Sequence, residues 1–193
     1  MGEPTITVSG LPAAPGDHIC AFYRGRAQRD EILMPFLADG VRAGDKCVCL
    51  ISAGEQGRIR SEVGAAGNLL DLVDSRATYL RSGSFVGEHM MEFWQEWAHR
   101  AFDVEGLSFA RGACEMSWAE ELRSSPGMDE LVSYEAKVNK VARNFPWVAL
   151  CLYDLDLFGG DVVVPMLKTH PKVLFSGMLV ENPYFVDPDE MLV

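Results

Sequence analysis

The chain has 193 residues, of which 48% are hydrophobic and 23% charged, a composition typical of a globular protein with a sizeable core. Seventeen basic and twenty-eight acidic residues give a formal net charge of −11, which disfavours direct binding to nucleic acid or to a membrane. The start, MGEPTITVSG, lacks a secretion signal, and no apolar run approaches the roughly 18 residues of a spanning helix, so a cytoplasmic protein is expected.

The first segments predict a tail, a strand and a helix. Residues 1–15 are rich in turn-forming residues and are expected to form a flexible tail, with a single domain over residues 16–193. The run HICAFY that follows is apolar and typical of a buried strand. A helix is expected from about Asp30, as its N-cap, to Arg42. Gly44 would end this helix, and Pro35 is tolerable only near the first turn.

The rest of the chain alternates between strand and helix patterns. DKCVCLIS predicts a buried strand, residues 55–67 a polar helix or loop, and ATYL another strand. Residues 85–103 predict an amphipathic helix, LSFARGACEMSW a strand, and GMDELVSYEAKVNKVARNF a helix. WVALCLYDLDLF is the strongest buried strand, and a short helix follows at about Asp161–Thr169. This alternation predicts an α/β sandwich with a mainly parallel central sheet covered by helices.

Ligands of open parallel sheets bind outside the carboxyl ends of the strands, which selects the residues that follow each predicted strand. The side chains at these positions include Tyr23, Arg24 and Arg26, then Glu115, Ser117 and Trp118, and finally Tyr153, Asp154 and Asp156. Tyr23, Trp118 and Tyr153 would line a mixed polar and apolar cavity with the sulfurs of Cys20 and Met116. Such a lining is typical of a small-molecule site.

The loop after the first strand reads YRGRAQRDE and lacks the residues of a phosphate-binding P-loop. It has one Gly and no Lys, Ser or Thr, which excludes ATP hydrolysis of the usual P-loop kind. Arg26 and Arg29 could still attract an anion to the helix N-terminus. A degenerate nucleotide-binding protein, with Asp154 beside these arginines and no turnover, is therefore one alternative.

Five cysteines occur without a CxxC motif, in apolar strand-like runs that favour buried and reduced thiols. The histidines show no metal-binding spacing, and no catalytic or cofactor motif is present, so no catalytic residue, metal ligand or cofactor is assigned. A thiol or metal redox sensor that uses Cys20 and Cys151, with His18 and His170, is a second alternative. Because side chains alternate along a strand, His18, Cys20 and Phe22 should share one face of the first strand, and Tyr23 should lie on the other face.

Several of these motifs together resemble the MEDS domain, a methanogen/methylotroph sensory domain. They are DHICAFYRGRAQRDEILMPFLADGVRAGDKCVCLIS, GACEMSWA, LVSYEAKVN, VALCLYDLDLF and HPKVLFSGMLVENPYFVDPDEML, in that order. The resemblance implies a RecA/KaiC-like core that has lost the Walker A loop. It implies a sensory role, in which a small, hydrocarbon-derived signal is bound and its presence passed to a regulatory partner.

The matching positions are His18, Cys20, Phe22, Tyr23, Glu115, Met116, Trp118, Glu135, Tyr153, Asp154, His170, Pro171, Asn182 and Pro183. Family members commonly carry an output domain, and the sequence contains none. We therefore expect output through a separate kinase, anti-sigma factor or transcription factor, or through a homodimer, unless the sequence is a piece of a longer protein. The expected ligand-binding residues are His18, Cys20, Tyr23, Arg26, Glu115, Trp118, Glu135, Tyr153, Asp154 and His170.

Overall fold

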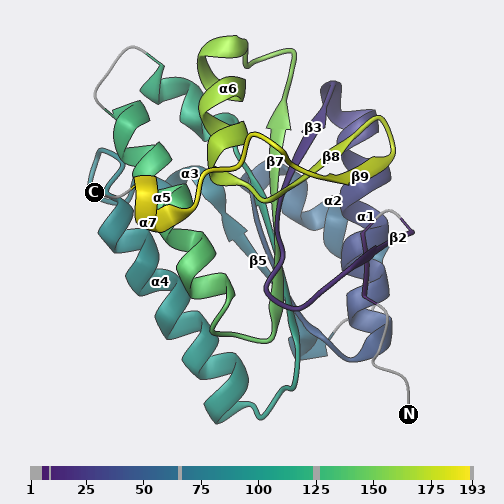
Figure 1. Ribbon diagram of the computed structural model, residues 1–193. Coiled ribbons are helices and arrows are strands. Elements are labelled where there is room, and N and C mark those ends of the chain that lie inside the picture. Colours follow the sequence, from purple (N-terminus) through teal and green to yellow (C-terminus); the bar gives the residue numbers. More distant parts are fainter. Residues whose placement is uncertain (1–5, 9, 65–66, 124–126, 192–193) are drawn as a thin grey trace.

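The computed structural model describes residues 6–8, 10–64, 67–123 and 127–191 and has a central sheet between two layers of helices (Figure 1). The sheet has seven strands, of which the last pair is antiparallel and the others are parallel. In spatial order the strands are β5 (Leu70–Asp74), β4 (Lys46–Ile51), β6 (Ala110–Glu115), β7 (Trp147–Asp154), β3 (His18–Tyr23), β8 (Lys172–Phe175) and β9 (Met178–Glu181). The predicted α/β sandwich is confirmed.

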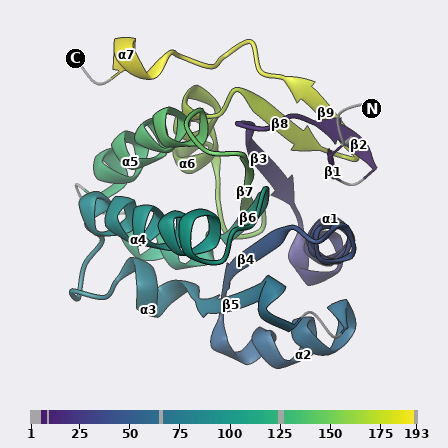
Figure 2. The ribbon, with the colours of Figure 1, turned by 90° about the horizontal axis from the view of Figure 1, so that it is seen from below.

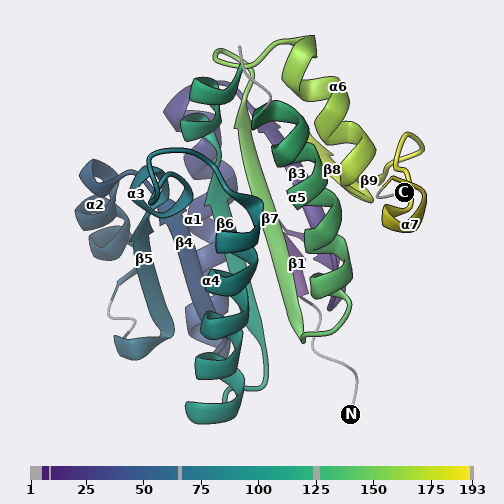
Figure 3. The same cartoon turned by 90° about the vertical axis from the view of Figure 1, so that its left-hand side faces the viewer.

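The helices divide between the two faces of the sheet (Figure 2). One face is covered by α1 (Gly25–Ala43) and α2 (Ala53–Val63). The other face carries α3 (Ser75–Tyr79), α4 (Gly87–His99), α5 (Gly127–Ala142) and α6 (Gly160–Thr169). Figure 3 shows α4 and α5 side by side over this face. No helix in the described ranges is long and apolar enough to cross a membrane.

Shorter elements complete the chain. They are two 3-10 turns (Gly67–Leu69 and Ser117–Leu122), a π-helical turn after α4 (Arg100–Val104) and the C-terminal helix α7 (Pro188–Met191), which packs on α5. The predicted apolar face of α4 is confirmed, because Met90, Trp94 and Trp97 are buried and Phe93 is partly buried against the same core.

Side chains on the strands alternate between two cores, one on each face of the sheet. Cys20 and Phe22 belong to the core beneath α4, α5 and α6, and His18 contacts α5 on the same face. Tyr23 belongs to the opposite core, beneath α1. The predicted division of β3 is therefore confirmed.

The first helix begins five positions earlier than the sequence predicts, and Asp30 is not its N-cap. Gly25, at φ 61°, is its first residue, and the backbone N–H of Gly25 donates to Asp154 Oδ1 at 3.2 Å. The carboxylate of Asp154 accepts from a backbone N–H that has no partner within the helix. Because Asp154 is far away in the sequence, no local sequence pattern predicts this contact. Pro35 consequently lies in the helix interior, on its exposed side, where solvent can satisfy the carbonyl that loses its partner. Gly44 ends the helix in the left-handed region, as predicted.

The strand expected at ATYL is wrong. The strand is β5, which precedes this segment, and Ser75–Tyr79 form the short helix α3. Asp74 is its N-cap: the side chain accepts a hydrogen bond from the N–H of Ala77 at 2.6 Å. This cap outweighs the strand preference of Thr78 and Tyr79.

Part of the segment that is expected to form a flexible tail has regular structure. Residues Ile6–Val8 (β1) and Leu11–Ala13 (β2) pair as a small antiparallel sheet. Val8 is fully buried against the core beneath α1, because that core extends beyond the central sheet. Residues 1–5 and 9, which the same expectation covers, lie outside the described residues.

Candidate functional site

Four polar side chains from separate segments meet in the core beneath α5 and α6. They are His18 on β3, Glu135 on α5, Cys151 on β7 and His170 directly after α6. His18 Nε2 lies 3.3 Å from Glu135 Oε2 and 3.4 Å from Cys151 Sγ. His170 Nε2 lies 3.7 Å from the same carboxylate oxygen. All four side chains are buried, so the cluster is closed to solvent.

Neighbouring groups fix how both imidazoles are oriented. His18 Nδ1 lies 3.2 Å from Asn139 Oδ1, and the Asn139 amide nitrogen donates to Thr169 O at 2.6 Å. Because that amide nitrogen is the donor, Oδ1 accepts from His18 Nδ1–H, which leaves Nε2 without a proton in the neutral ring. His170 Nδ1 lies 2.8 Å from the carbonyl of Met166, which can only accept. The Nε2 atom of His170 has no hydrogen-bond partner among the residues that the structure describes.

Burial and charge act against each other on Glu135. Burial raises the pKa of its carboxyl, but the contacts with His18, His170 and the Tyr153 hydroxyl favour the charged form and bring that pKa below its ordinary value. Tyr153 donates from its hydroxyl to Glu135 Oε1 at 2.9 Å and supports the same charged form. Burial, followed by the charge of His18, lowers the pKa of His170 to about 3. His170 is therefore neutral near pH 7.

The thiols of this core are poor nucleophiles. Burial, and then the charge of Glu135, raise the pKa of Cys20, while a hydrogen bond with Cys114 and burial raise that of Cys151. Cys151, His18 and Asn139 lie in the nucleophile–base–amide order of cysteine proteases. Cys151 is nevertheless 5% exposed and His18 fully buried, so this arrangement offers a substrate no access.

A second polar group lies on the opposite face of the sheet. Tyr23 donates from its hydroxyl to Glu115 Oε1 at 3.0 Å, and Ser117 Oγ donates to Glu115 Oε2 at 2.7 Å. Burial and the nearby charges of Glu115 and Asp154 raise the pKa of Tyr23, which keeps its hydroxyl a donor. Tyr23 and Glu115 are largely buried, and the hydrogen bonds of the Glu115 carboxylate are to Tyr23 and to the nearby residue Ser117.

The start of α1, where a phosphate would sit in a P-loop protein, is occupied by side chains of the protein itself. Gln28 accepts from the N–H of Arg24, and Asp154 accepts from the N–H of Gly25. Arg29 pairs with Asp30 and Glu55, at 2.9 and 2.8 Å. Arg26 projects into solvent, with Glu55 3.5 Å away. The predicted anion-attracting group is therefore largely committed to internal contacts.

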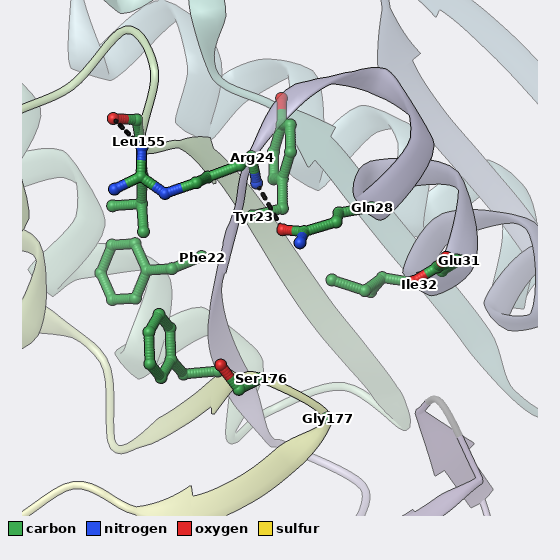
Figure 4. Close-up of a pocket in the computed structure, with 10 residues that line it drawn as sticks. Phe22, Tyr23, Arg24, Gln28, Glu31, Ile32, Leu155, Ser176 and Gly177 are labelled. Atoms are coloured by element: carbon green, nitrogen blue, oxygen red, sulfur yellow. Dashed lines mark hydrogen bonds between the residues drawn. The ribbon is translucent and has the colours of Figure 1, made fainter.

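A pocket of about 570 Å³ opens at the carboxyl ends of β3 and β8, beside the start of α1 (Figure 4). Figure 4 shows Phe22 and Leu155 on one side and the α1 side chains of Gln28 and Ile32 on the other. A more apolar groove of about 370 Å³ shares Phe22, Leu155 and Phe175 with it. The adjacent strands β3 and β7 are followed by helices on opposite faces of the sheet, α1 and α6, which leaves a crevice between the strand ends. The pocket lies beside this crevice, which is the position that ligands of open α/β sheets use.

The ten predicted ligand-binding residues do not form one site. His18, Cys20, Glu135, Tyr153 and His170 lie in or beside the buried cluster, and Tyr23 and Glu115 form the pair on the other face. Asp154 caps α1 and Arg26 is exposed. Trp118 stacks on Tyr79 at 4.1 Å inside the aromatic core. Tyr23 alone among these ten lines the strand-end pocket.

Sequence reasoning missed several residues of both regions. Asn139 follows Glu135 by one helical turn, so two polar residues on the apolar face of α5 were a signal that could have been used. Cys151 was considered for a thiol or metal sensor and not among the ligand-binding residues. Phe175, Ser176 and Gly177 reach the pocket through the β8–β9 hairpin, whose position beside β3 is a long-range feature.

Comparisons with known proteins agree on a family. The sequence profile described as "MEDS: MEthanogen/methylotroph, DcmR Sensory domain" matches residues 17–171. The chain is 26% identical to the transcriptional repressor DcmR of Methylorubrum extorquens over 171 residues, which cover 84% of this chain and 61% of the repressor. The chain thus spans about three fifths of the length of this curated relative.

Solved structures show the same arrangement at low identity. The uncharacterized protein PH0321 from Pyrococcus horikoshii, solved in complex with an unknown peptide, has a TM-score of 0.60 and 13% identity over 85% of this chain and 78% of its own. The flagellar accessory protein FlaH from Methanocaldococcus jannaschii has a TM-score of 0.54 and 8% identity over 89% and 78% of the two chains. At these identities the likeness shows the fold alone, which is RecA-like.

Proposed function

The chain belongs to the MEDS family of sensory domains, and on that premise we propose that it binds a small-molecule signal at the strand ends and transmits it by protein–protein contact. In this proposal the chain is not an enzyme, and it signals whether a ligand is bound in the pocket. The observation that carries it is the pocket between β3, β8 and the start of α1. Its volume of about 570 Å³ lies within the range of small-molecule sites.

The lining of the pocket favours an amphipathic or hydrocarbon-derived ligand. Phe22, Leu155 and Phe175 supply apolar walls, which continue into the neighbouring apolar groove. Gln28 and Glu31 place polar groups on the α1 side, and the guanidinium of Arg24 lies beside Leu155 (Figure 4). A molecule with a short apolar part and one polar group would bury its apolar part against Phe22, and its polar group would pair with these polar side chains.

Transmission would use the hairpin that closes the pocket. Ser176 and Gly177 join β8 to β9 at φ 49° and 74°, the backbone of a tight two-residue turn, and both line the pocket. The hairpin and the segment after it carry exposed apolar side chains, Met178, Val180 and Tyr184. A ligand that contacts the turn would shift these side chains, which a partner protein would read.

The relative named a transcriptional repressor supports a regulatory partner. We propose that this partner is a separate kinase, anti-sigma factor or transcription factor, or a second copy of the chain. Nucleotide binding is the weaker alternative, because Arg29 and Asp154 already have protein partners and Gly25 N–H is satisfied by a carboxylate.

Thermal unfolding of the purified chain with a panel of ligands tests the proposal. The panel contains short alcohols, halogenated methanes, methylamines and nucleotides. A ligand of the strand-end pocket should raise the Tm with concentration. Phe175→Ala should abolish this rise, whereas Val104→Ala, an exposed apolar residue in the turn after α4, should leave it unchanged. A ligand whose effect survives Phe175→Ala, or a panel without any effect, would contradict the proposal.

A further inference from the structure

We propose that His18, Glu135, Cys151 and His170 form a binding site for one divalent transition-metal ion, with Zn²⁺ as the reference occupant. The site is separate from the strand-end pocket, and the inference goes beyond the proposed function. It rests on three independent features of the buried cluster: the spacing of the donor atoms, the orientation of the imidazoles and the balance of charge.

Four of the six distances between donor atoms match those around a tetrahedral ion. Bonds of about 2.0–2.3 Å from zinc to nitrogen, oxygen and sulfur place neighbouring ligand atoms of a tetrahedron about 3.3–3.8 Å apart. His18 Nε2 lies 3.3 Å from Glu135 Oε2 and 3.4 Å from Cys151 Sγ. Cys151 Sγ and His170 Nε2 lie 3.8 and 3.7 Å from that oxygen. All four donor atoms lie within 4.8 Å of one another.

The surrounding groups present the correct donor atoms. Asn139 and the carbonyl of Met166 hold the Nδ1–H groups of His18 and His170, which leaves each Nε2 lone pair directed into the cluster. Tyr153 occupies Glu135 Oε1 and leaves Oε2 for the ion. His170 Nε2 is fully buried and lacks a hydrogen-bond partner within the described ranges, and an unpaired nitrogen of this kind calls for an explanation. A metal ion supplies the missing partner.

Charge and donor chemistry select the class of ion. A divalent ion bound by one thiolate and one carboxylate gives a site without net charge, which can be buried at low cost. Binding releases the thiol proton of Cys151 to solvent. Two imidazoles, one thiolate and one carboxylate suit Zn²⁺ and neighbouring ions such as Co²⁺, whereas Mg²⁺ and Ca²⁺ require mostly oxygen ligands.

Titration of the chelator-treated full chain with Zn²⁺ and Co²⁺, under a phosphine reductant, tests the inference. We expect one ion per chain, no competition from Mg²⁺, and a Co²⁺ spectrum with a thiolate charge-transfer band and the intense visible bands of four-coordination. Cys151→Ser should abolish the charge-transfer band, and His170→Ala should weaken Zn²⁺ binding by more than about 100-fold.

Matched controls separate the cluster from other donors. Cys49→Ser removes an equally buried thiol on the other face of the sheet, and His99→Ala removes an exposed imidazole, so both should bind as the unmodified chain does. Circular dichroism checks that each variant folds. If Cys151→Ser does not fold, the Co²⁺ spectrum of the unmodified chain decides. A missing charge-transfer band, the absence of stoichiometric binding, or loss of binding in His99→Ala overturns the inference.

Discussion

The buried cluster and the strand-end pocket lie at opposite ends of β3 and differ in burial and in exposure to solvent. His18 at the start of β3 is fully buried and held by hydrogen bonds to α5 and β7. At the other end of β3, Arg24 is largely exposed, and its ion pair with Asp156 lies in solvent. The first region is ordered before any ligand arrives, and the second has an open side.

The contrast fits the different tasks that we propose for the two ends of β3. A closed and pre-oriented donor set suits an ion that stays bound and contributes to folding. An open pocket beside a hairpin turn suits a ligand that comes and goes. Phe22 connects the two regions, because it lines the pocket and its ring lies 6.3 Å from that of Tyr153, which holds Glu135.

The largest effect is expected from Glu135→Ala. The substitution leaves His18, Tyr153 and any bound ion without the buried carboxylate, so the free energy of unfolding should fall by about 3–5 kcal/mol. Denaturant unfolding measures this loss. Glu96→Ala on the exposed side of α4 is the control and should change stability by less than about 0.5 kcal/mol. Equal losses in both variants would show that the buried carboxylate of Glu135 contributes no more to stability than an exposed one.

Tyr153→Phe should have an intermediate effect. It deletes one hydroxyl and leaves Glu135 Oε1 without its donor, which should cost about 1–3 kcal/mol of stability. If the cluster binds an ion, the affinity for Zn²⁺ should also fall by about 10–100-fold while the Co²⁺ charge-transfer band persists. An unchanged affinity would show that Tyr153 does not orient the carboxylate.

Acid should weaken the contact between α2 and α1, the helix that carries one wall of the pocket. Hydrogen bonding to Arg58 and Arg29 lowers the pKa of Glu55 from 4.5 to about 2, and these contacts tie α2 to α1. Because the folded-state pKa is the lower one, the contribution of Glu55 is complete above pH 4.5 and is lost as the pH falls toward 2. Solvent screening limits it to the order of 1 kcal/mol.

Glu55→Gln checks the sign of that effect. The variant should be less stable than the unmodified chain at pH 7, and denaturant unfolding at a series of pH values should show the two stabilities converging between about pH 4.5 and pH 2. A gap that stays constant with pH would mean that the charge of Glu55 contributes nothing.

Arg24→Ala should produce the smallest change in stability. The ion pair with Asp156 is exposed on both sides, so its loss should cost about 0.5 kcal/mol or less. If the pocket binds the signal, the same variant should reduce the ligand-induced rise in Tm. A large loss of stability would instead show that the pocket wall contributes as much to the free energy of unfolding as the cluster does.

The sequence allowed the layered fold to be predicted, because it depends on periodicity. Alternating strand and helix patterns gave the sandwich, and period two divided Cys20 from Tyr23 correctly. The errors fall where a distant partner decides the local structure. Asp154 moves the start of α1 to Gly25, and no neighbouring residue signals that contact.

The sites were harder to predict for the same reason. The four donors of the cluster come from β3, α5, β7 and the segment after α6, so their spacing along the chain carries no metal motif. The rule that ligands bind at strand ends found Tyr23 at the pocket. It could not find Phe175, because the pairing of β8 with β3 is a property of the whole sheet.

Hydrogen exchange of the chelated chain with and without Zn²⁺ tests the separation of the two regions most directly. We expect Zn²⁺ to slow amide exchange at the start of β3, in α5 around Glu135, in β7 around Cys151 and at Thr169–His170. The pocket turn at Ser176 and Gly177 should be unchanged. Protection confined to the surface near His99, or none anywhere, would contradict the account.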